Sequence, residues 1–183
     1  CNYIHLPVQS GNSACLERMN RTYDREWYLN RIDAIRTIIP DCGISSDVIA
    51  GFCGETEEEH QDTLSMMQYA KYDMSYMYYY SERPGTLAAK KYVDDVPLET
   101  KKRRLAEIVE VQYQLSLQNN LADIGKTFEV LVEKTSKKSE DEWCGRNQQN
   151  KVIIFPKGNH KIGDYIHVYV ESANKATLRG RVV

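Results

Sequence analysis

The segment 47–59 combines residue types that could bind a ligand. Its first half is an apolar run that predicts a buried strand, and Thr56 with Glu59 three residues later is a capping-box pair that predicts a helix start. Gly51 and Gly54 lie between them and allow the backbone to turn close to a bound molecule. Because a helix N-terminus carries partial positive charge, this segment could bind the polar part of a cofactor. A tight turn of purely structural origin would need the same glycines.

Two further places carry polar groups suited to binding. Gln9 and Ser10 follow an apolar segment, and their amide and hydroxyl could hydrogen-bond a ribose or a carboxylate. Capping the next helix is the alternative role for Ser10. Arg83 begins a turn-forming tetrapeptide, where its guanidinium could bind a phosphate or carboxylate in bidentate fashion. An ion pair with Glu82 or Glu55 that shapes the loop is the alternative for Arg83.

The cysteines do not have the spacing of a disulfide framework or of a metal site. They are odd in number and widely scattered, at Cys1, Cys15, Cys42, Cys53 and Cys144. We therefore expect reduced cysteines that mostly pack, including a buried or turn-lining thiol at Cys53, and no metal ligand in this chain.

Strand and helix patterns alternate through the first 80 residues. Runs of β-branched and aromatic residues predict strands, and apolar residues at near-helical spacing predict helices. The expected order is strand 3–8, helices 15–20 and 24–39, strand 48–52, helix 56–71 and strand 74–80. Helical segments between strands favour parallel pairing with right-handed crossovers. The sequence therefore predicts a doubly wound sheet or part of a barrel.

The pattern changes after a long helix that begins near residue 95. Short β-type runs separated by turn signals predict a small antiparallel barrel, and the formal net charge is −5 over residues 1–118 but +3 over residues 119–183. We expect two domains with these bounds. Small barrels are common scaffolds for oligonucleotides, whereas a modest basic excess is also common on solvated surfaces. The basic run Lys101–Arg104 on the long helix is predicted to be a solvated face.

Several sequence blocks together resemble the radical S-adenosylmethionine (SAM) methylthiotransferase family. The blocks that resemble the later strands of its catalytic domain are His5–Gly11 with Leu16, Met19, Arg21 and Tyr23, then 51–56, then Tyr80–Thr86. The blocks similar to its RNA-binding TRAM domain are Val130–Glu133 with Ser136, Gly145–Arg146, Asn150–Val152 and Gly163–Asp164. The resemblance covers nearly the whole chain. It implies an α/β fold, the C-terminal part of a radical SAM (β/α) partial barrel followed by a small antiparallel β-barrel.

The amino-acid sequences of the first and third blocks are most similar to those of the branch of the family that acts on tRNA. That resemblance implies methylthiolation of C2 of N6-(dimethylallyl)adenosine next to the anticodon. The alternatives are methylthiolation of threonylcarbamoyl adenosine or of a ribosomal protein, or a non-catalytic RNA-binding module. Two departures from the family pattern stand out: Cys53 replaces a proline, and Glu55 lies one residue later than the acid of the wider radical SAM pattern.

The resemblance also implies cofactors. The full enzyme would use SAM and two 4Fe-4S clusters, one to cleave SAM reductively and one to carry the inserted sulfur. The cluster-binding CxxxCxxC is absent from this chain. We therefore expect no cluster ligand and no catalytic residue here, and a fragment that is inactive alone.

The implied site residues form three groups. Those expected to bind SAM are Gln9, Ser10, Ala50, Gly51, Phe52 and Glu55, where backbone contacts of 50–52 are favoured over the carboxylate of Glu55. Those expected to contact the substrate are Arg21, Tyr80, Arg83 and Thr86, and a tyrosine of the cluster 76–80 could stack on the target base. Those expected to bind RNA, mainly through phosphates, are Arg146, Asn150, Lys151, Lys157 and Arg179.

The sequence also predicts a cellular location and partners for the chain. It contains no apolar run long enough to span a bilayer, so a cytoplasmic location without membrane contact is expected. It begins without methionine at a segment that already resembles a strand, which suggests a piece of a longer protein. The expected partners are a tRNA anticodon stem-loop and a reductant protein for the cluster. The oligomeric state is left open.

Overall fold

The computed structural model describes all 183 residues, and they form two compact units. The first unit comprises residues 5–40 and 44–113, and the second comprises residues 1–4, 41–43 and 114–183. The long helix α5 (Leu98–Leu121) contributes to both, because the division falls between residues 113 and 114. The predicted domain boundary after residue 118 stays a prediction.

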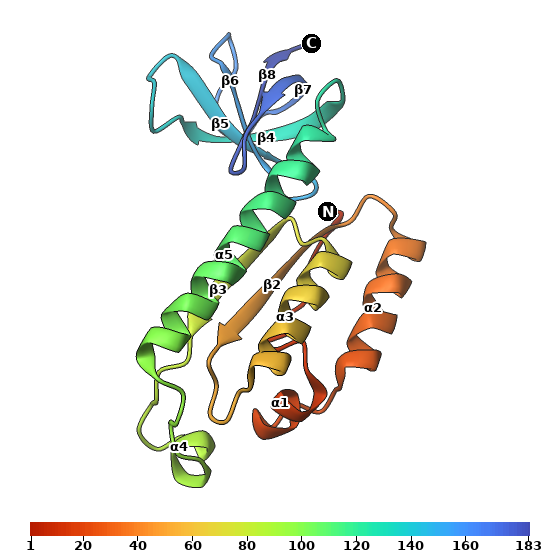
Figure 1. Ribbon diagram of the computed structural model, residues 1–183. Coiled ribbons are helices and arrows are strands. Elements are labelled where there is room, and N and C mark those ends of the chain that lie inside the picture. The colour runs from red at the N-terminus through yellow and green to blue at the C-terminus, as the bar shows by residue number, and fades with distance from the viewer. The chain divides into compact units, whose positions relative to one another are not determined.

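Most of the first unit is a three-stranded sheet with its helices, although the strand residues Tyr3, Ile4 and Gly43 are grouped with the second unit (Figure 1). The elements before α5 are β1 (Tyr3–His5), α1 (Ser13–Arg18), α2 (Arg25–Ile38), β2 (Gly43–Ala50), α3 (Glu57–Ala70), β3 (Met74–Tyr79) and α4 (Leu87–Lys91). The strand order is β1-β2-β3, and β2 pairs with β3 in parallel, with Ala50 opposite Tyr79. The predicted α/β class is confirmed.

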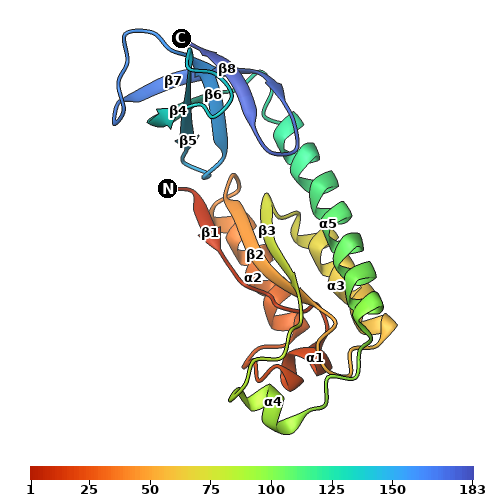
Figure 2. The same cartoon turned by 90° about the vertical axis from the view of Figure 1, so that its left-hand side faces the viewer.

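Helices α2, α3 and α5 lie on one face of this sheet, and no helix lies on the other face (Figure 2). Alternate residues of β3 show the difference. Ser75 is buried and donates to the side-chain oxygen of Gln112 on α5 at 2.7 Å, whereas Tyr76 and Tyr78 are 47% and 57% exposed. The covered face carries the core of this unit, and the open face carries tyrosines.

Capping side chains fix where the helices begin. Asp24 caps α2 through the amide of Trp27. Thr56 and Glu59 form the predicted capping box at α3, with each side chain accepting from the other residue's amide. Thr86 caps the short helix α4, which the sequence patterns did not indicate. The turn before α3 therefore has a fixed geometry.

The second unit contains a closed five-stranded barrel. Its strands are β4 (Thr127–Thr135), β5 (Glu142–Asn147), β6 (Val152–Pro156), β7 (Tyr165–Ala173) and β8 (Leu178–Val182), in the order β4-β5-β6-β8-β7. Its core includes Val130, Ile153, Phe155, Val168 and Leu178. The predicted small barrel is confirmed.

One pairing in the barrel is parallel, although the sequence suggested an antiparallel barrel. Strand β6 pairs with β8 in parallel, and the other four pairings are antiparallel. An odd number of strands cannot alternate in direction all the way around a closed ring, so one parallel pair is unavoidable. None of the helices in either unit combines the length and apolarity needed to cross a membrane.

Candidate cofactor site and RNA-binding surface

The C-terminal ends of the parallel strands bring three predicted residues together. Gln9 forms a bridge with Val48 of β2, and its carbonyl accepts from the amide of Ile49 at 2.9 Å. The amide of Tyr80 donates to the carbonyl of Ala50 at 2.8 Å. Gln9, the turn after Ala50 and Tyr80 therefore lie along one edge of the sheet. In open α/β sheets, ligands bind at this edge.

Gln9 has an unusual backbone and an unpartnered side chain. Its φ is 67°, a left-handed conformation that costs free energy for a residue with a Cβ. The residue is 6% exposed, and its side-chain amide makes no hydrogen bond. By contrast, the fully buried hydroxyl of Ser10 accepts from the amide of Asn12, the N-cap of α1, and lies 3.4 Å from the hydroxyl of Thr63. Ser10 thus has the supporting role, and Gln9 carries the free polar group.

The side chain of Glu55 points back into the loop between β2 and α3 that contains it. Its carboxylate accepts from the amide of Gly51 at 2.7 Å and from Arg104 at 2.9 Å, and both side chains are nearly inaccessible. Burial raises the pKa of Glu55, and the Gly51 amide and the Arg104 guanidinium oppose that rise. Arg104 also donates to the carbonyl of Glu55 at 2.9 Å. The role of Glu55 in cofactor binding stays a prediction, and its contacts in this structure hold the loop.

Three more side chains contact the backbone just after β2 and β3. Arg18 donates to the carbonyl of Cys53 at 3.2 Å and to the carboxylate of Glu59 at 3.0 Å. Asp95 accepts from the amide of Gly54 at 2.7 Å. Lys101 donates to the carbonyl of Tyr80 at 3.2 Å. Segments from both sides of the loop in sequence therefore fix the backbone at the strand ends.

The prediction that Lys101–Arg104 is a solvated face was wrong for two of its members. Lys101 and Arg104 are each 4% exposed and face the loop, whereas Lys102 and Arg103 are exposed. Lys101 and Arg104 are three residues apart and therefore share one face of α5, which is the face packed against the neighbouring elements. There Lys101 pairs with Asp94, and Arg104 pairs with Glu55.

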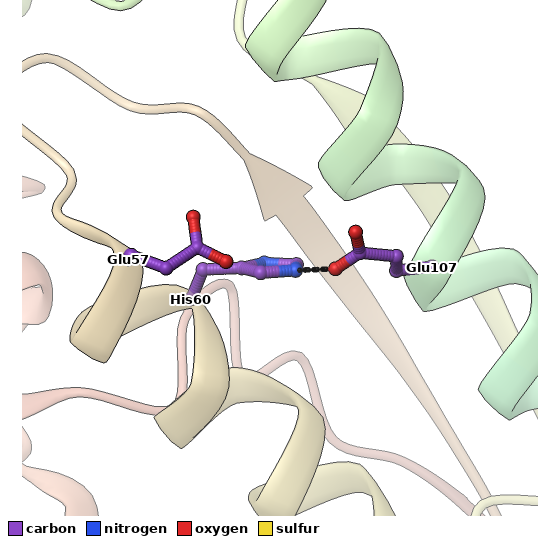
Figure 3. A group of neighbouring side chains, drawn as sticks. All are labelled: Glu57, His60 and Glu107. Carbon is purple, nitrogen blue, oxygen red and sulfur yellow. Dashed lines mark hydrogen bonds and ion pairs between the residues drawn. The ribbon is translucent and has the colours of Figure 1, made fainter.

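A cluster of ionisable side chains lies between α3 and α5 (Figure 3). His60 is fully buried on α3, and its Nε2 lies 2.7 Å from the carboxylate of Glu107 on α5. Arg103 donates at 2.6 Å both to Glu107 and to Glu57, and it lowers the pKa of Glu57 to about 2. Arg104 also donates to Glu57, at 3.2 Å. Because two guanidinium groups already neutralise these carboxylates, the cluster clamps the two helices rather than suiting a metal ion.

A groove of about 550 Å³ collects the predicted substrate residues. Tyr80, Arg83 and Thr86 line it together with Tyr78 and apolar residues such as Ile49. Arg83 is exposed and its guanidinium has no partner, so the ion pair considered for it with Glu82 or Glu55 is not formed. Arg21, the remaining predicted substrate residue, does not line this groove.

Tyr80 presents a buried hydroxyl to this region. Its ring meets that of Phe52 edge-on, with centroids 4.9 Å apart, and the hydroxyl is buried beside the thiol of Cys53. Burial raises the pKa of Tyr80 to about 12, so the phenol stays protonated at neutral pH. A protonated phenol is a hydrogen-bond donor.

Most of the predicted RNA-binding residues on the barrel already have partners within their unit. The pairs are Arg146 with Glu133 and Asn150, Lys151 with Asp123, Lys157 over the ring of Trp143, and Arg179 with Glu142. Arg146 and Arg179 line one cleft of about 390 Å³, and Lys134, Lys137 and Lys138 line it with them. Sequence reasoning missed these three lysines. Their sequence signal was the close spacing of lysines 134, 137 and 138 around the turn after β4.

Two stretches of the chain match known protein families. Residues 1–67 match the radical SAM superfamily, and residues 122–183 match the TRAM domain. The chain therefore combines a stretch similar to the radical SAM superfamily with a stretch similar to the TRAM domain.

Relatives sharpen this assignment. Three proteins named tRNA-2-methylthio-N(6)-dimethylallyladenosine synthase are similar over all 183 residues: those of Amoebophilus asiaticus at 62% identity, Phocaeicola vulgatus at 57% and Christiangramia forsetii at 56%. The chain spans 38%, 40% and 38% of their respective lengths. Among solved structures, a conserved protein of Methanococcus maripaludis is 25% identical with a TM-score of 0.27, covering 33% of this chain and 79% of that one.

Proposed function

We propose that the protein of which this chain is a part methylthiolates C2 of N6-(dimethylallyl)adenosine next to the tRNA anticodon. The observation that carries this proposal is the 62% identity over the whole chain to a synthase named for that product. The alternatives are methylthiolation of threonylcarbamoyl adenosine or a ribosomal protein, and a non-catalytic RNA-binding module. The chain alone is expected to be inactive, because it spans about 40% of the length of these relatives.

The strand-end residues fit a polar cofactor such as SAM. The free amide of Gln9 and the buried hydroxyl of Tyr80 lie at the edge where α/β sheets bind ligands, and Gly51, with φ 69°, turns the backbone between them. Gln9 and the backbone of Ala50, Gly51 and Phe52 would hold it. When bound, SAM and the iron–sulfur clusters supply the radical, sulfur and methyl chemistry, and these residues position and shield the reacting groups.

The cysteines beside this edge do not fit an iron–sulfur cluster. Cluster ligands are thiolates, whereas burial raises the pKa of Cys15 to about 11 and also raises that of Cys53. Both thiols are packed with Phe52 in a small apolar cluster. We therefore place no cluster ligand at this edge, and the clusters of the proposed enzyme would be bound by other parts of the protein.

The groove beside Tyr80 has the chemistry to accept a modified adenosine. Exposed aromatic faces such as Tyr78 can stack on a base, and apolar residues such as Ile49 can contact a prenyl group. The free guanidinium of Arg83 can bind a phosphate. The basic barrel would bind the anticodon stem-loop of the same tRNA, in the cytoplasm, with a separate reductant protein serving the cluster.

Mass spectrometry of tRNA nucleosides from a strain lacking the gene tests this function. We expect loss of the 2-methylthio derivative of N6-(dimethylallyl)adenosine and accumulation of the nucleoside without the methylthio group. An unchanged level of that derivative would contradict the proposal. Loss of the methylthio group from threonylcarbamoyl adenosine or from a ribosomal protein would instead assign the alternative substrates.

A further inference from the structure

Lys101 occupies an unusual place on α5. It lies near the start of the helix, where the macrodipole disfavours a cation, and it is only 4% exposed. Burying an ammonium group costs free energy unless the group is paired and hydrogen-bonded. Neither helix stability nor contact with solvent therefore accounts for a lysine at this position. The contacts of its side chain with other elements do account for it.

The side chain of Lys101 contacts the ends of two strands. A Cβ on Gly51 would meet three carbons of the Lys101 stem, so the stem fills the space beside this glycine. The ammonium group donates to the carbonyl of Tyr80 at 3.2 Å. Gly51 directly follows β2, and Tyr80 directly follows β3. One side chain from α5 thus supports both strand ends.

The ring of Tyr80 is held from two sides. The ammonium group of Lys101 lies over the ring, 5.1 Å from its centroid, and Phe52 meets the ring edge-on with centroids 4.9 Å apart. The hydroxyl of the same ring is buried at the strand ends. Because Lys101 contacts both the carbonyl and the ring of Tyr80, the direction of this hydroxyl depends on the ammonium group.

Asp94 balances the charge of Lys101. Both carboxylate oxygens of Asp94 accept from the ammonium group, the second at 2.7 Å, and the side chain of Asp94 is 30% exposed. The carboxylate compensates the buried cation, whereas the contacts with Gly51 and Tyr80 are made by Lys101 itself. Charge balance and support of the strand ends can therefore be separated by mutation.

We propose that Lys101 is a positioning residue of the cofactor site. Its stem supports the turn at Gly51, and its ammonium group fixes Tyr80. Through both contacts it sets the affinity of the strand ends for SAM without touching the cofactor. This role deepens the proposed function, on which it rests for the identity of the cofactor.

Calorimetric titration of SAM into the complete protein, with its iron–sulfur clusters reconstituted, tests this role. Lys101→Met keeps an unbranched stem and removes the ammonium group, so it should weaken SAM binding about fivefold, the order expected for one net hydrogen bond. Lys102→Met is the control, since Lys102 is exposed and pairs with Glu99 of the same helix. It should bind SAM like the unmodified protein. Equal affinities of Lys101→Met and the unmodified protein would overturn the proposal.

A double variant separates positioning from stability. Lys101→Met leaves the carboxylate of Asp94 without its cation, and adding Asp94→Asn removes that charge. The double variant should therefore regain stability in urea unfolding relative to Lys101→Met. Its affinity for SAM should stay reduced, because methionine cannot donate to the carbonyl of Tyr80. Recovery of SAM binding together with stability would assign Lys101 a structural role alone and would overturn the proposal.

The 183-residue chain gives a second readout that needs no SAM. The ring signals of Tyr80 in NMR spectra of tyrosine-labelled chain can be assigned by their loss in Tyr80→Phe. We expect these signals to shift in Lys101→Met and in the double variant, and to stay in place in Lys102→Met. Unchanged signals in Lys101→Met would show that the ammonium group does not fix this ring.

Failure of this role and failure of the proposed function give different results. If the gene deletion removes the methylthio group from tRNA while Lys101→Met binds SAM normally, Lys101 is not a positioning residue and the function stands. If the deletion leaves tRNA unchanged while Lys101→Met still weakens SAM binding, the function fails and the role of Lys101 stands. If the unmodified complete protein binds no SAM, the role proposed for Lys101 is wrong.

Discussion

At the scale of single residues, the buried pair of Arg104 and Glu55 shows how charge is used at the strand ends. Both side chains are almost inaccessible, and the pair also bonds the amide of Gly51 and the carbonyl of Glu55. A buried ion pair adds little net stability over an apolar pair, but breaking it leaves one buried charge without compensation. Its function is to fix the loop.

We expect Arg104→Met to destabilise the fold by about 3–5 kcal/mol at neutral pH, measured by urea unfolding. Without the guanidinium, burial keeps the pKa of Glu55 in the folded state above its unfolded value. The folded variant then binds more protons than the unfolded chain, so its stability should fall as the pH rises from about 4.5. Adding Glu55→Gln should recover most of the loss at neutral pH. A loss independent of pH and of Glu55 would contradict this account.

Gln9 carries a second residue-scale prediction. Gln9→Ala removes an unpartnered amide, so it should raise the KM for SAM several-fold in the complete enzyme. Ser10→Ala is the matched comparison. Since the Ser10 hydroxyl supports the α1 cap, that change should cost stability first. An unchanged KM for SAM in Gln9→Ala would show that Gln9 does not contact the cofactor.

At the scale of elements, the turn between β2 and α3 depends on a glycine whose replacement strains the backbone. Gly51 has φ 69°, and a Cβ there would lie 2.4 Å from Cγ of Lys101. We expect Gly51→Ala to destabilise by about 2–4 kcal/mol, from the left-handed backbone and from displacement of Lys101. Gly85 has φ 83° with open space around it, so Gly85→Ala should cost only about 1–2 kcal/mol. Equal losses of stability for the two variants in thermal unfolding would contradict a steric clash with Lys101.

The clamp between α3 and α5 gives a prediction with pH dependence. Arg103 lowers the pKa of Glu57 to about 2, and His60 together with Arg103 lowers the pKa of Glu107 against the opposing effect of burial, so the folded state holds these carboxylates ionised. Their contribution is complete above about pH 4.5 and is lost as the pH falls toward 2. We expect Arg103→Gln to cost less than about 1 kcal/mol at pH 7, because the pairs are partly solvated.

Urea unfolding of the unmodified chain and of Arg103→Gln at pH 7, 4 and 3 measures that difference. It should shrink steadily over the series. Lys102→Gln is the control, since Lys102 pairs only with a neighbour on the same helix. A difference that grows toward low pH would show that Arg103 does not act through these carboxylates.

The elements also show which features the sequence could predict. The capping box at Thr56 and the alternation of strands and helices are local signals, and both are present in the structure. The burial of Lys101 and Arg104 was missed because their partners, Asp94 and Glu55, are set by the packing of α5 on the loop. Helix periodicity alone does not show which face of a charged run is covered. The parallel pairing of β6 with β8 depends on closure of the barrel, which no single strand reveals.

At the scale of the whole molecule, the two units carry complementary chemistry. One presents free polar groups and an aromatic groove at the ends of parallel strands, and the other presents a basic cleft on a closed barrel. The candidate site was predicted in part: Gln9, Gly51 and Tyr80 come together, as do Arg83 and Thr86. The cations of the barrel were harder to predict, because pairing with carboxylates depends on cross-strand register.

We propose above all that these residues form part of a tRNA methylthiotransferase. The most direct test replaces the corresponding segment of the Phocaeicola vulgatus relative, 57% identical, with this chain and expresses the chimera in a strain lacking its own synthase. Mass spectrometry of tRNA nucleosides should show the 2-methylthio derivative of N6-(dimethylallyl)adenosine restored. A folded chimera that reconstitutes its iron–sulfur clusters and yet leaves only the nucleoside without the methylthio group would contradict the claim.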